Sequence, residues 1–128
     1  MRILFGFDYK NYDENGSVGY RPSARGIIRK DGKYAFVYSS KYDYYTFSGG
    51  GIEQNETRSL ALIREIREEL GLEIKPDTIE EYGAIIRKEK GMIDEIFVQE
   101  NYYYTCEVFD TVVHEQKLEN YEADEGFN

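Results

Sequence analysis

The 128-residue chain has few of the residues that build cross-links, metal clusters and linkers: one cysteine, one histidine and two prolines. The single Cys106 excludes an internal disulfide framework and a multi-cysteine zinc site, and it fits a reducing cytosol. The single His114 cannot form a histidine-based metal site. Because Pro22 and Pro76 stand alone and no repeat or low-complexity stretch is visible, we expect one domain over residues 1–128.

Long apolar runs and basic residues are also scarce. The longest apolar run near the N-terminus, residues 3–7, is far shorter than a signal-peptide core or a membrane span, so we expect a cytoplasmic protein without a membrane partner. Sixteen Lys and Arg stand against 25 Asp and Glu, which gives a net charge of −9. A chain this acidic repels phosphodiester backbones, so a nucleic-acid partner on a basic face is disfavoured, and a phosphate-bearing partner needs bridging cations.

Apolar residues make up 41% of the chain and aromatic residues 16%, which is typical of a globular protein. Turn signals and apolar runs predict a helix over residues 57–70, closed by Gly71 in the position favoured for a left-handed C-cap. They predict strands before residue 11 and at 24–30, 34–39, 44–47, 80–88 and 95–109. Asp31-Gly32 predicts a tight hairpin turn between two of these strands. Strands on both sides of one helix indicate an α/β fold, a mixed β-sheet with the helix packed on it.

The predicted helix carries its apolar and acidic side chains on two separate arcs. The apolar arc is the expected core face and contains Leu62, Ile63, Ile66 and Leu70. Glu65, Glu68 and Glu69 share an adjacent arc, whereas Arg64 and Arg67 lie on the far side. Carboxylates this close repel one another, and a divalent cation such as Mg²⁺ or Mn²⁺ would turn them into an oxygen ligand set. The alternative is a solvated face in which Arg64 pairs with Glu68.

The segment that leads into the helix favours the cation site. From Gly50 the chain reads Gly, five residues, Glu56, seven residues, and then Arg64-Glu65-Ile66-Arg67-Glu68-Glu69-Leu70-Gly71-Leu72. This resembles the Nudix box, G-x5-E-x7-R-E-U-x-E-E-x-G-U with U aliphatic, at every fixed position. Ser48 and Asn55 stand where the family often has proline and glycine. The resemblance implies a Nudix-type α/β/α sandwich and Mg²⁺-dependent hydrolysis of a diphosphate linked to a further group.

The resemblance also implies a role for each residue of the box. Gly50, in a glycine-rich turn, offers its carbonyl as a metal ligand, and Glu68 and Glu69 are the core metal ligands. Glu65 either binds metal or acts as the base that deprotonates the attacking water. The last two residues of the set are Arg64, which orients the glutamates, and Glu56, which supports that network or binds a further metal.

Glu100 is the strongest candidate outside the box. Alternate residues of the strand predicted at 95–109 form an apolar and aromatic face, and Glu100 is the one acid on it. An unpaired carboxylate on such a face is costly, so it needs a cation or a proton. We expect a catalytic or metal-binding role, as many family members have a late acid beyond the box. The alternatives are a structural pair with Arg21 or Arg25, or a bulge that turns Glu100 to solvent.

Substrate-binding candidates are arginines and tyrosines that could hold phosphates and stack a base. They are Arg21, Arg25, Tyr44 and Tyr102, with Tyr45 and Tyr104 as neighbours of the same kind. Alternating tyrosines are also common as half-buried packing residues in sheets, and this alternative stays open.

The expected function is Mg²⁺-dependent hydrolysis of a nucleoside diphosphate linked to another moiety, with nucleoside triphosphates as the leading class of small-molecule substrate. The enzymatic alternative is a nucleotide-sugar or related pyrophosphatase. The alternative from another class is a non-catalytic Nudix-like module that senses a nucleotide. The intact Arg64-Glu65 and Glu68-Glu69 pairs argue against that module, since a binder has no need of a full catalytic carboxylate set.

The C-terminal stretch, residues 122–128, ends where a further strand would begin, with no second amphipathic helix after it. We therefore expect the C-terminal helix of the fold to be missing. One face of the sheet would then expose an apolar patch, which favours a homodimer or makes the fold unstable.

Overall fold

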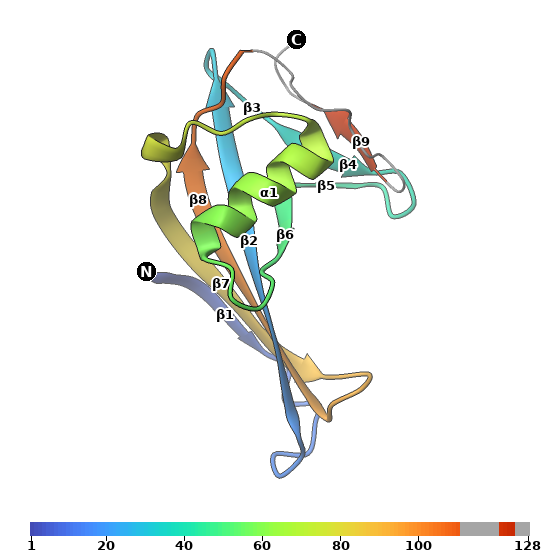
Figure 1. The fold of residues 1–128 in the computed structure, drawn as a ribbon. Helices are drawn as coiled ribbons and strands as arrows, with labels where there is room; N and C mark the ends of the chain where they lie inside the picture. The colour runs from blue at the N-terminus through green and yellow to red at the C-terminus, as the bar shows by residue number, and fades with distance from the viewer. Residues whose placement is uncertain (111–120, 125–128) are drawn as a thin grey trace.

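The computed structural model describes residues 1–110 and the backbone of residues 121–124 (Figure 1). The elements, in chain order, are β1 (Ile3–Asp8), β2 (Val18–Lys30), β3 (Lys33–Tyr34), β4 (Phe36–Ser39), β5 (Tyr44–Thr46), β6 (Ser48–Gly51), α1 (Arg58–Leu70), the 3₁₀ turn η1 (Pro76–Thr78), β7 (Glu80–Lys90), β8 (Ile96–Cys106) and β9 (Tyr121–Asp124). The predicted order of strands, helix and strands is therefore confirmed.

The main sheet is mixed. Its strands lie in the order β1-β7-β8-β2-β3, and β6 also pairs with β2. The β1–β7 and β2–β8 pairs are parallel, whereas β7–β8, β2–β3 and β2–β6 are antiparallel. A second, three-stranded sheet has the order β5-β4-β9. Strand β9, which pairs with β4, lies inside the C-terminal stretch where the sequence analysis predicts no strand.

Helix α1 begins and ends where the sequence predicts. The Thr57 side chain accepts a hydrogen bond from the backbone N–H of Leu60, which satisfies one of the free donors of the first turn. At the other end Gly71 has φ 69°, in the left-handed region, and its N–H donates to the carbonyl of Arg67. These two caps define where the helix begins and ends, and the helix geometry then sets the directions of the box side chains between Arg64 and Leu70.

The core lies between α1 and the sheet. Leu62, Ile66 and Leu70 have no exposed surface and pack in one cluster with Ala24 of β2. Gly26 permits this close approach, because a Cβ there would lie 2.5 Å from Cδ1 of Ile66. The predicted apolar arc is confirmed at these helix positions, and the helix therefore presents its adjacent acidic arc toward one edge of the sheet.

Two local predictions are wrong: where strand β2 begins, and the conformation of the glycine-rich segment. Strand β2 begins at Val18 rather than at residue 24, because the parallel pairing with β8 carries it through Pro22, opposite Glu100. The glycine-rich segment expected to be a turn is strand β6, which pairs with β2 from Gly26 to Ser23. The tight turn at Asp31-Gly32 is confirmed, since both residues have positive φ, 53° and 77°.

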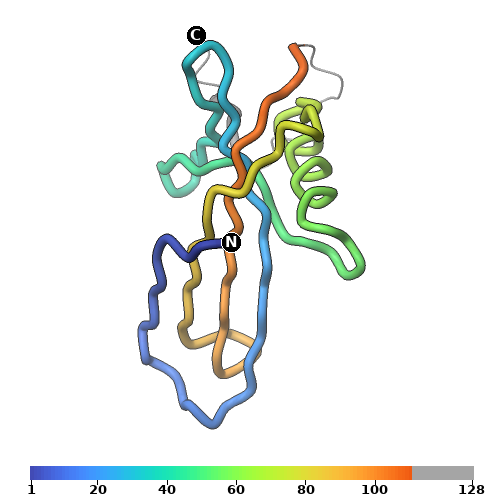
Figure 2. The backbone as a smooth tube through the Cα atoms, turned by 90° about the vertical axis from the view of Figure 1, so that its left-hand side faces the viewer, coloured from blue at the N-terminus to red at the C-terminus, as the bar shows by residue number. Residues whose placement is uncertain are grey.

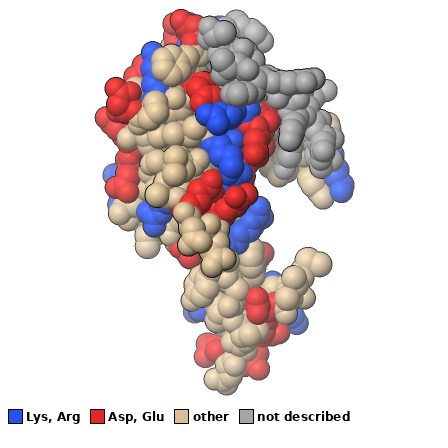
Figure 3. Space-filling view, in the orientation of Figure 1, with Lys and Arg blue, Asp and Glu red and all other residues tan. Residues whose placement is uncertain are grey.

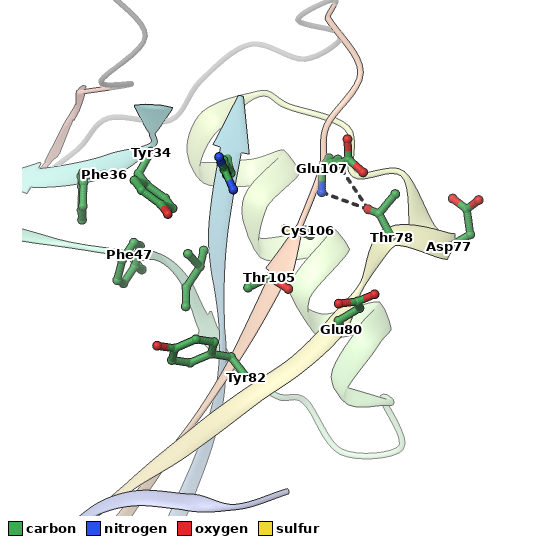
Figure 4. Close-up of a pocket in the computed structure, with 12 residues that line it drawn as sticks. Tyr34, Phe36, Phe47, Asp77, Thr78, Glu80, Tyr82, Thr105, Cys106 and Glu107 are labelled. Carbon is green, nitrogen blue, oxygen red and sulfur yellow. Dashed lines mark hydrogen bonds between the residues drawn. The ribbon is translucent and has the colours of Figure 1, made fainter. Parts of the chain in front are cut away.

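One side of the main sheet carries α1, and the second sheet lies near the other side at its upper end (Figure 2). A pocket of about 830 Å³ lies on that other side, lined in part by Ile27, Phe36, Phe47 and Tyr82 (Figure 4). It contains none of the predicted site residues. In the described part of the chain α1 is the only α-helix, while residues 111–120 and 125–128, on which the predictions of a missing C-terminal helix and a homodimer depend, lie outside it.

Across residues 1–110 and 121–124, no helix combines the length and the apolar character needed to cross a membrane.

Gly49 offers a test of how tightly β6 is held on β2. It has φ 154°, and a Cβ there would lie 2.1 Å from the carbonyl oxygen of Ala24. We expect Gly49→Ala to lower the free energy of unfolding by about 1–3 kcal/mol in denaturant titrations. The control Gly6→Ala meets no atom within 4 Å and should change it by less than about 0.5 kcal/mol. Equal stability of the two variants would show that β6 does not pack against β2 in this way.

Candidate active site

Strand β6 lies along the acidic edge of α1, so the glycines and the glutamates of the box meet. Glu69 accepts a hydrogen bond from the Ser48 hydroxyl at 2.7 Å and one from the Gly49 N–H at 3.3 Å. Burial raises the pKa of Glu69, although both hydrogen bonds and the charge of Arg25 oppose that shift. Ser48, which replaces the common proline, therefore has a definite structural partner.

Glu65 lies directly against the backbone of β6. A Cβ at Gly50 would fall 2.5–2.7 Å from the carboxyl atoms of Glu65, so only glycine allows this contact. The Glu65 side chain is one-fifth exposed. The backbone at Gly50 is thus closely approached, as predicted, and the group that approaches it is the Glu65 carboxylate.

Arg64 connects the loop, the strand and the helix. Its Nε and Nη2 donate to the two carboxyl oxygens of Glu56 at 2.8 and 2.9 Å, and its Nη1 donates to Glu65 at 2.9 Å. Its Nη2 also donates to the carbonyl of Gly51 at 3.0 Å. The prediction that Arg64 points to the far side of the helix is wrong, because its long side chain turns back over the adjacent face.

The alternative pairing of Arg64 with Glu68 is present: the Arg64 Nη1 lies 3.5 Å from the Glu68 carboxylate, and the Glu68 side chain is half exposed. It is longer than the contacts of Arg64 with Glu56 and Glu65, at 2.8 and 2.9 Å. Arg64 lowers the pKa of Glu56 to about 2, with help from the N–H of Glu53, so Glu56 is a firmly ionised partner. Acidic and basic side chains gather together on the face that carries α1 (Figure 3).

Asn55 lies in the loop between β6 and α1. Its φ is 68°, in the left-handed region where the family often has glycine. Asparagine tolerates this conformation better than most other non-glycine residues. The loop therefore turns at Asn55, and Glu56 can face Arg64.

As they stand, the described residues contain no group of three or more His, Cys, Asp or Glu side chains close enough to hold a metal ion. Glu56 and Glu65 both point to Arg64, while Glu69 points to Ser48, so the three carboxylates do not converge on one point. The donor set nevertheless fits Mg²⁺ or Mn²⁺ in chemistry, since it is made only of oxygens and lies beside the open backbone at Gly50.

Glu100 lies on the face of β8 that α1 covers, as the alternation predicts. The hydroxyl of Tyr102 donates a hydrogen bond to its carboxylate. The alternative pairing with Arg25 is wrong, because Arg25 is on the other face and donates to the Phe47 carbonyl at 3.0 Å and to Asn101 Oδ1 at 3.4 Å.

The structure does not bring all the substrate-binding candidates together in one site. Arg21 lies beside β6, with its guanidinium 3.8 Å from where a Cβ on Gly51 would be. The ring of Tyr102 lies 3.7 Å from the guanidinium of Arg58, a residue that sequence reasoning missed because its position at the start of α1 carries no chemical signal. Tyr44 lies on β5 of the second sheet, beside Tyr42, so the structure does not place it with the others.

Comparison with known proteins decides the family. The model of the NUDIX domain matches residues 19–125. The chain belongs to the Nudix family. Nudix hydrolases generally use divalent metal ions, which agrees with the oxygen-only donor set of this domain.

Two curated relatives have parts similar to this Nudix domain. An RNA pyrophosphohydrolase of Hydrogenovibrio crunogenus is 43% identical over 56 residues, which are 43% of this chain and 34% of that protein. A CTP pyrophosphohydrolase of Escherichia coli is 39% identical over 67 residues, which are 49% of this chain and 47% of that protein. The chain thus spans between a third and a half of the length of these relatives.

The fold is shared with solved structures. A MutT/nudix family protein from Enterococcus faecalis superposes with a TM-score of 0.63 at 14% identity, over 84% of this chain and 43% of that one. At this identity the likeness shows the fold alone, and it confirms the Nudix-type α/β fold predicted from the sequence.

The Arg64 contacts predict a titration. The pKa of Glu56 is about 2, below its ordinary value of 4.5, so the stability that this pair contributes is complete above pH 4.5 and is lost as pH falls toward 2. We expect Arg64→Gln to raise the pKa of Glu56 toward 4.5, as followed by carbon NMR of the side-chain carboxyl.

The matched control for this titration is Arg67→Gln. Arg67 lies on α1, as Arg64 does, but it pairs with Glu73, which follows the helix. Glu56 is not among its partners, so the Arg67→Gln variant should leave the pKa of Glu56 near 2. A Glu56 pKa that stays near 2 in the Arg64→Gln variant would contradict the claim that the contacts with Arg64 lower it.

Proposed function

We propose that this Nudix domain hydrolyses the diphosphate linkage of a nucleoside diphosphate linked to another moiety, with nucleoside triphosphates as the leading substrates. The observation that carries the proposal is the contact between the Glu65 carboxylate and the backbone at Gly50, braced by Arg64. The RNA and CTP pyrophosphohydrolases that share part of this sequence support the same class of reaction.

The residues that would hold Mg²⁺ or Mn²⁺ are Glu65, Glu68, Glu69 and the carbonyl of Gly50. When bound, such a cation lowers the pKa of a coordinated water and offsets the charge that develops on the leaving phosphate. Both carboxyl oxygens of Glu56 accept hydrogen bonds from Arg64. We therefore assign Glu56 to the orientation of this arginine rather than to direct binding of the cation.

The protein's own groups would act in three ways. Glu65, one-fifth exposed and fixed by Arg64, is the carboxylate best placed to accept a proton from an attacking water. Burial raises the pKa of Glu69, so this site favours a compensating positive charge. Arg21, next to Gly51, is available to a phosphate of the substrate.

Conversion of two glutamates to glutamine tests this proposal. We expect Glu65→Gln and Glu69→Gln each to lower kcat by about 100-fold or more, because each removes a charged oxygen donor from the reacting centre. The measurement is Mg²⁺-dependent release of phosphate or pyrophosphate from a panel of nucleoside triphosphates and nucleotide sugars. Glu14→Gln, in the exposed loop between β1 and β2, serves as the control and should keep full activity.

The outcomes separate the alternatives. Full turnover in both glutamine variants would overturn the assignment of the site. Turnover of nucleotide sugars alone would favour the related pyrophosphatase. Tight binding of a nucleotide by the wild-type chain, without turnover of any compound in the panel, would favour the sensing module.

Glu100 has its own test. We expect Glu100→Gln to weaken Mn²⁺ binding, measured by electron paramagnetic resonance, with an unchanged thermal melt. Tyr102→Phe removes the hydroxyl that donates to Glu100 and should have a smaller effect in the same direction. Unchanged Mn²⁺ affinity and unchanged rate in Glu100→Gln would leave Glu100 with a structural role only.

A further inference from the structure

Arg58 is the first residue of α1, and its side chain lies on an aromatic ring of the main sheet. Its guanidinium carbon is 3.7 Å from the centroid of the Tyr102 ring, which is the distance of direct stacking. Figure 1 shows the first turn of α1 beside β8, the strand that carries Tyr102. Arg58 is exposed and Tyr102 is half-buried, so the guanidinium covers the ring from the solvent side.

The same tyrosine holds the carboxylate of Glu100. Its hydroxyl donates a hydrogen bond to Glu100, which lies two residues earlier on the same face of β8. In the described part of the chain, no arginine or lysine forms an ion pair with Glu100. Hydrogen bonds and charges in such a series polarise one another, so the cation on the ring makes the hydroxyl a better donor. Arg58, Tyr102 and Glu100 therefore form one chain of contacts that ends on a carboxylate.

This chain of contacts lies beside the glycine-rich strand of the box. Tyr102 pairs with Ala24 of β2, which in turn pairs with Gly50 of β6. One strand, β2, thus separates β8 from β6, and two strand spacings are about 10 Å. Glu100 shares its face of β8 with Tyr102, so it lies on the side of the sheet where the box glutamates meet β6.

Glu100 differs from the other acid that an arginine supports. Both carboxyl oxygens of Glu56 accept hydrogen bonds from Arg64, which lowers the pKa of Glu56 to about 2. Arg58 reaches Glu100 only through the hydroxyl of Tyr102. An arginine bound directly to a carboxylate competes with a metal ion for the same oxygens, whereas an arginine behind a tyrosine does not. Glu100 is therefore oriented while its oxygens stay open to a cation.

The position of Arg58 is unfavourable for the helix itself. A positive charge in the first turn opposes the helix dipole, and the first turn of α1 contains no acidic residue to offset it. Stacking of an exposed arginine on a ring stabilises by an amount of the same order. The two effects offset each other, so the contact adds little to the stability of α1. A local rule broken without a gain in stability is typical of a residue that serves function.

We propose that Arg58 is a positioning residue for Glu100, acting through the ring and the hydroxyl of Tyr102, so that Glu100 presents its carboxylate to the divalent cation of the site. This inference rests on the proposed function for the existence of that cation site. Arg58 occupies one of the seven unspecified positions between Glu56 and Arg64, so the box itself assigns it no role.

A double-mutant cycle on Mn²⁺ binding tests the inference in the intact chain without turnover. The proteins are wild type, Arg58→Met, Glu100→Gln and the double variant, and the probe is Mn²⁺ alone, followed by electron paramagnetic resonance. We expect Arg58→Met to weaken binding by about 3-fold or more. In the Glu100→Gln background the same substitution should have no further effect. Arg58→Lys keeps a cation over the ring and should retain most of the affinity.

The sign of the effect separates positioning from simple electrostatics. Removal of a positive charge near a cation site strengthens cation binding, because the repulsion between the two is lost. Weaker binding in Arg58→Met is therefore the opposite of the bare charge effect. Unchanged or tighter Mn²⁺ binding in this variant would overturn the inference. Equal weakening with and without Glu100→Gln would also overturn it, since Arg58 would then act by another route.

Two further variants serve as controls. Arg67→Met removes a positive charge from the same helix, but Arg67 pairs with Glu73, so this variant should not weaken Mn²⁺ binding. Tyr102→Phe keeps the ring and removes the hydroxyl, so Arg58→Met should add nothing to its effect. The thermal melt of Arg58→Met should match that of wild type, because stacking and the helix dipole offset each other.

Steady-state kinetics separate this inference from the proposed function. We expect Arg58→Met to raise the Mg²⁺ concentration needed for the half-maximal rate, with an unchanged KM for the nucleotide at saturating Mg²⁺. A raised KM for the nucleotide would show that Arg58 binds substrate and would overturn the inference. Absence of all turnover, with the expected coupling in Mn²⁺ binding, would contradict only the proposed reaction. Normal turnover without that coupling would contradict only the role of Arg58.

Discussion

The guanidinium of Arg64 is the interaction on which the arrangement of the site depends. It binds Glu56 from the loop, Glu65 from its own helix and the carbonyl of Gly51 from β6. Three segments that approach from different directions are therefore fixed by one planar group, whose donors have a rigid geometry. A lysine, with a single ammonium group, could not reproduce these contacts.

Close backbone contacts supply the other half of the arrangement. Gly49 packs against Ala24, and Gly50 packs against the Glu65 carboxylate, so β6 lies between the sheet and the acidic side of α1. The same helix is held on the sheet by Ile66 over Gly26. The chemistry of the site is thus a consequence of packing, because the absence of side chains at these glycines lets charged oxygens come close to backbone.

Much of this was accessible from the sequence because it depends on local rules. The bounds of α1 follow from Thr57, from the apolar period and from Gly71, and each acts within one or two turns of helix. The spacing from Gly50 to Glu69 predicts the family by its resemblance to the Nudix box, and the NUDIX domain model confirms that prediction. The alternation of β8 predicts that Glu100 shares a face with Tyr102 and Tyr104, and the pairing of β8 with β2 places that face on the side of α1.

What the sequence did not predict depends on contacts between distant segments. The segment around Gly50 is a strand because β2 is free to pair with it, and nothing in a run of glycines indicates pairing. The direction of Arg64 depends on where Glu56 and Gly51 lie in three dimensions, and a helical wheel contains neither. Residue type alone predicts that Tyr44 belongs to the site, but chain topology places it in the second sheet.

The most direct test of the account is anomalous diffraction from crystals of the chain soaked in Mn²⁺. The account predicts a manganese peak bordered by Gly50, Glu65 and Glu69, with Arg64 still bound to Glu56. Manganese elsewhere, or no peak while Glu65 stays on Arg64 and Glu69 stays on Ser48, would contradict the claim that this carboxylate set is a cation site.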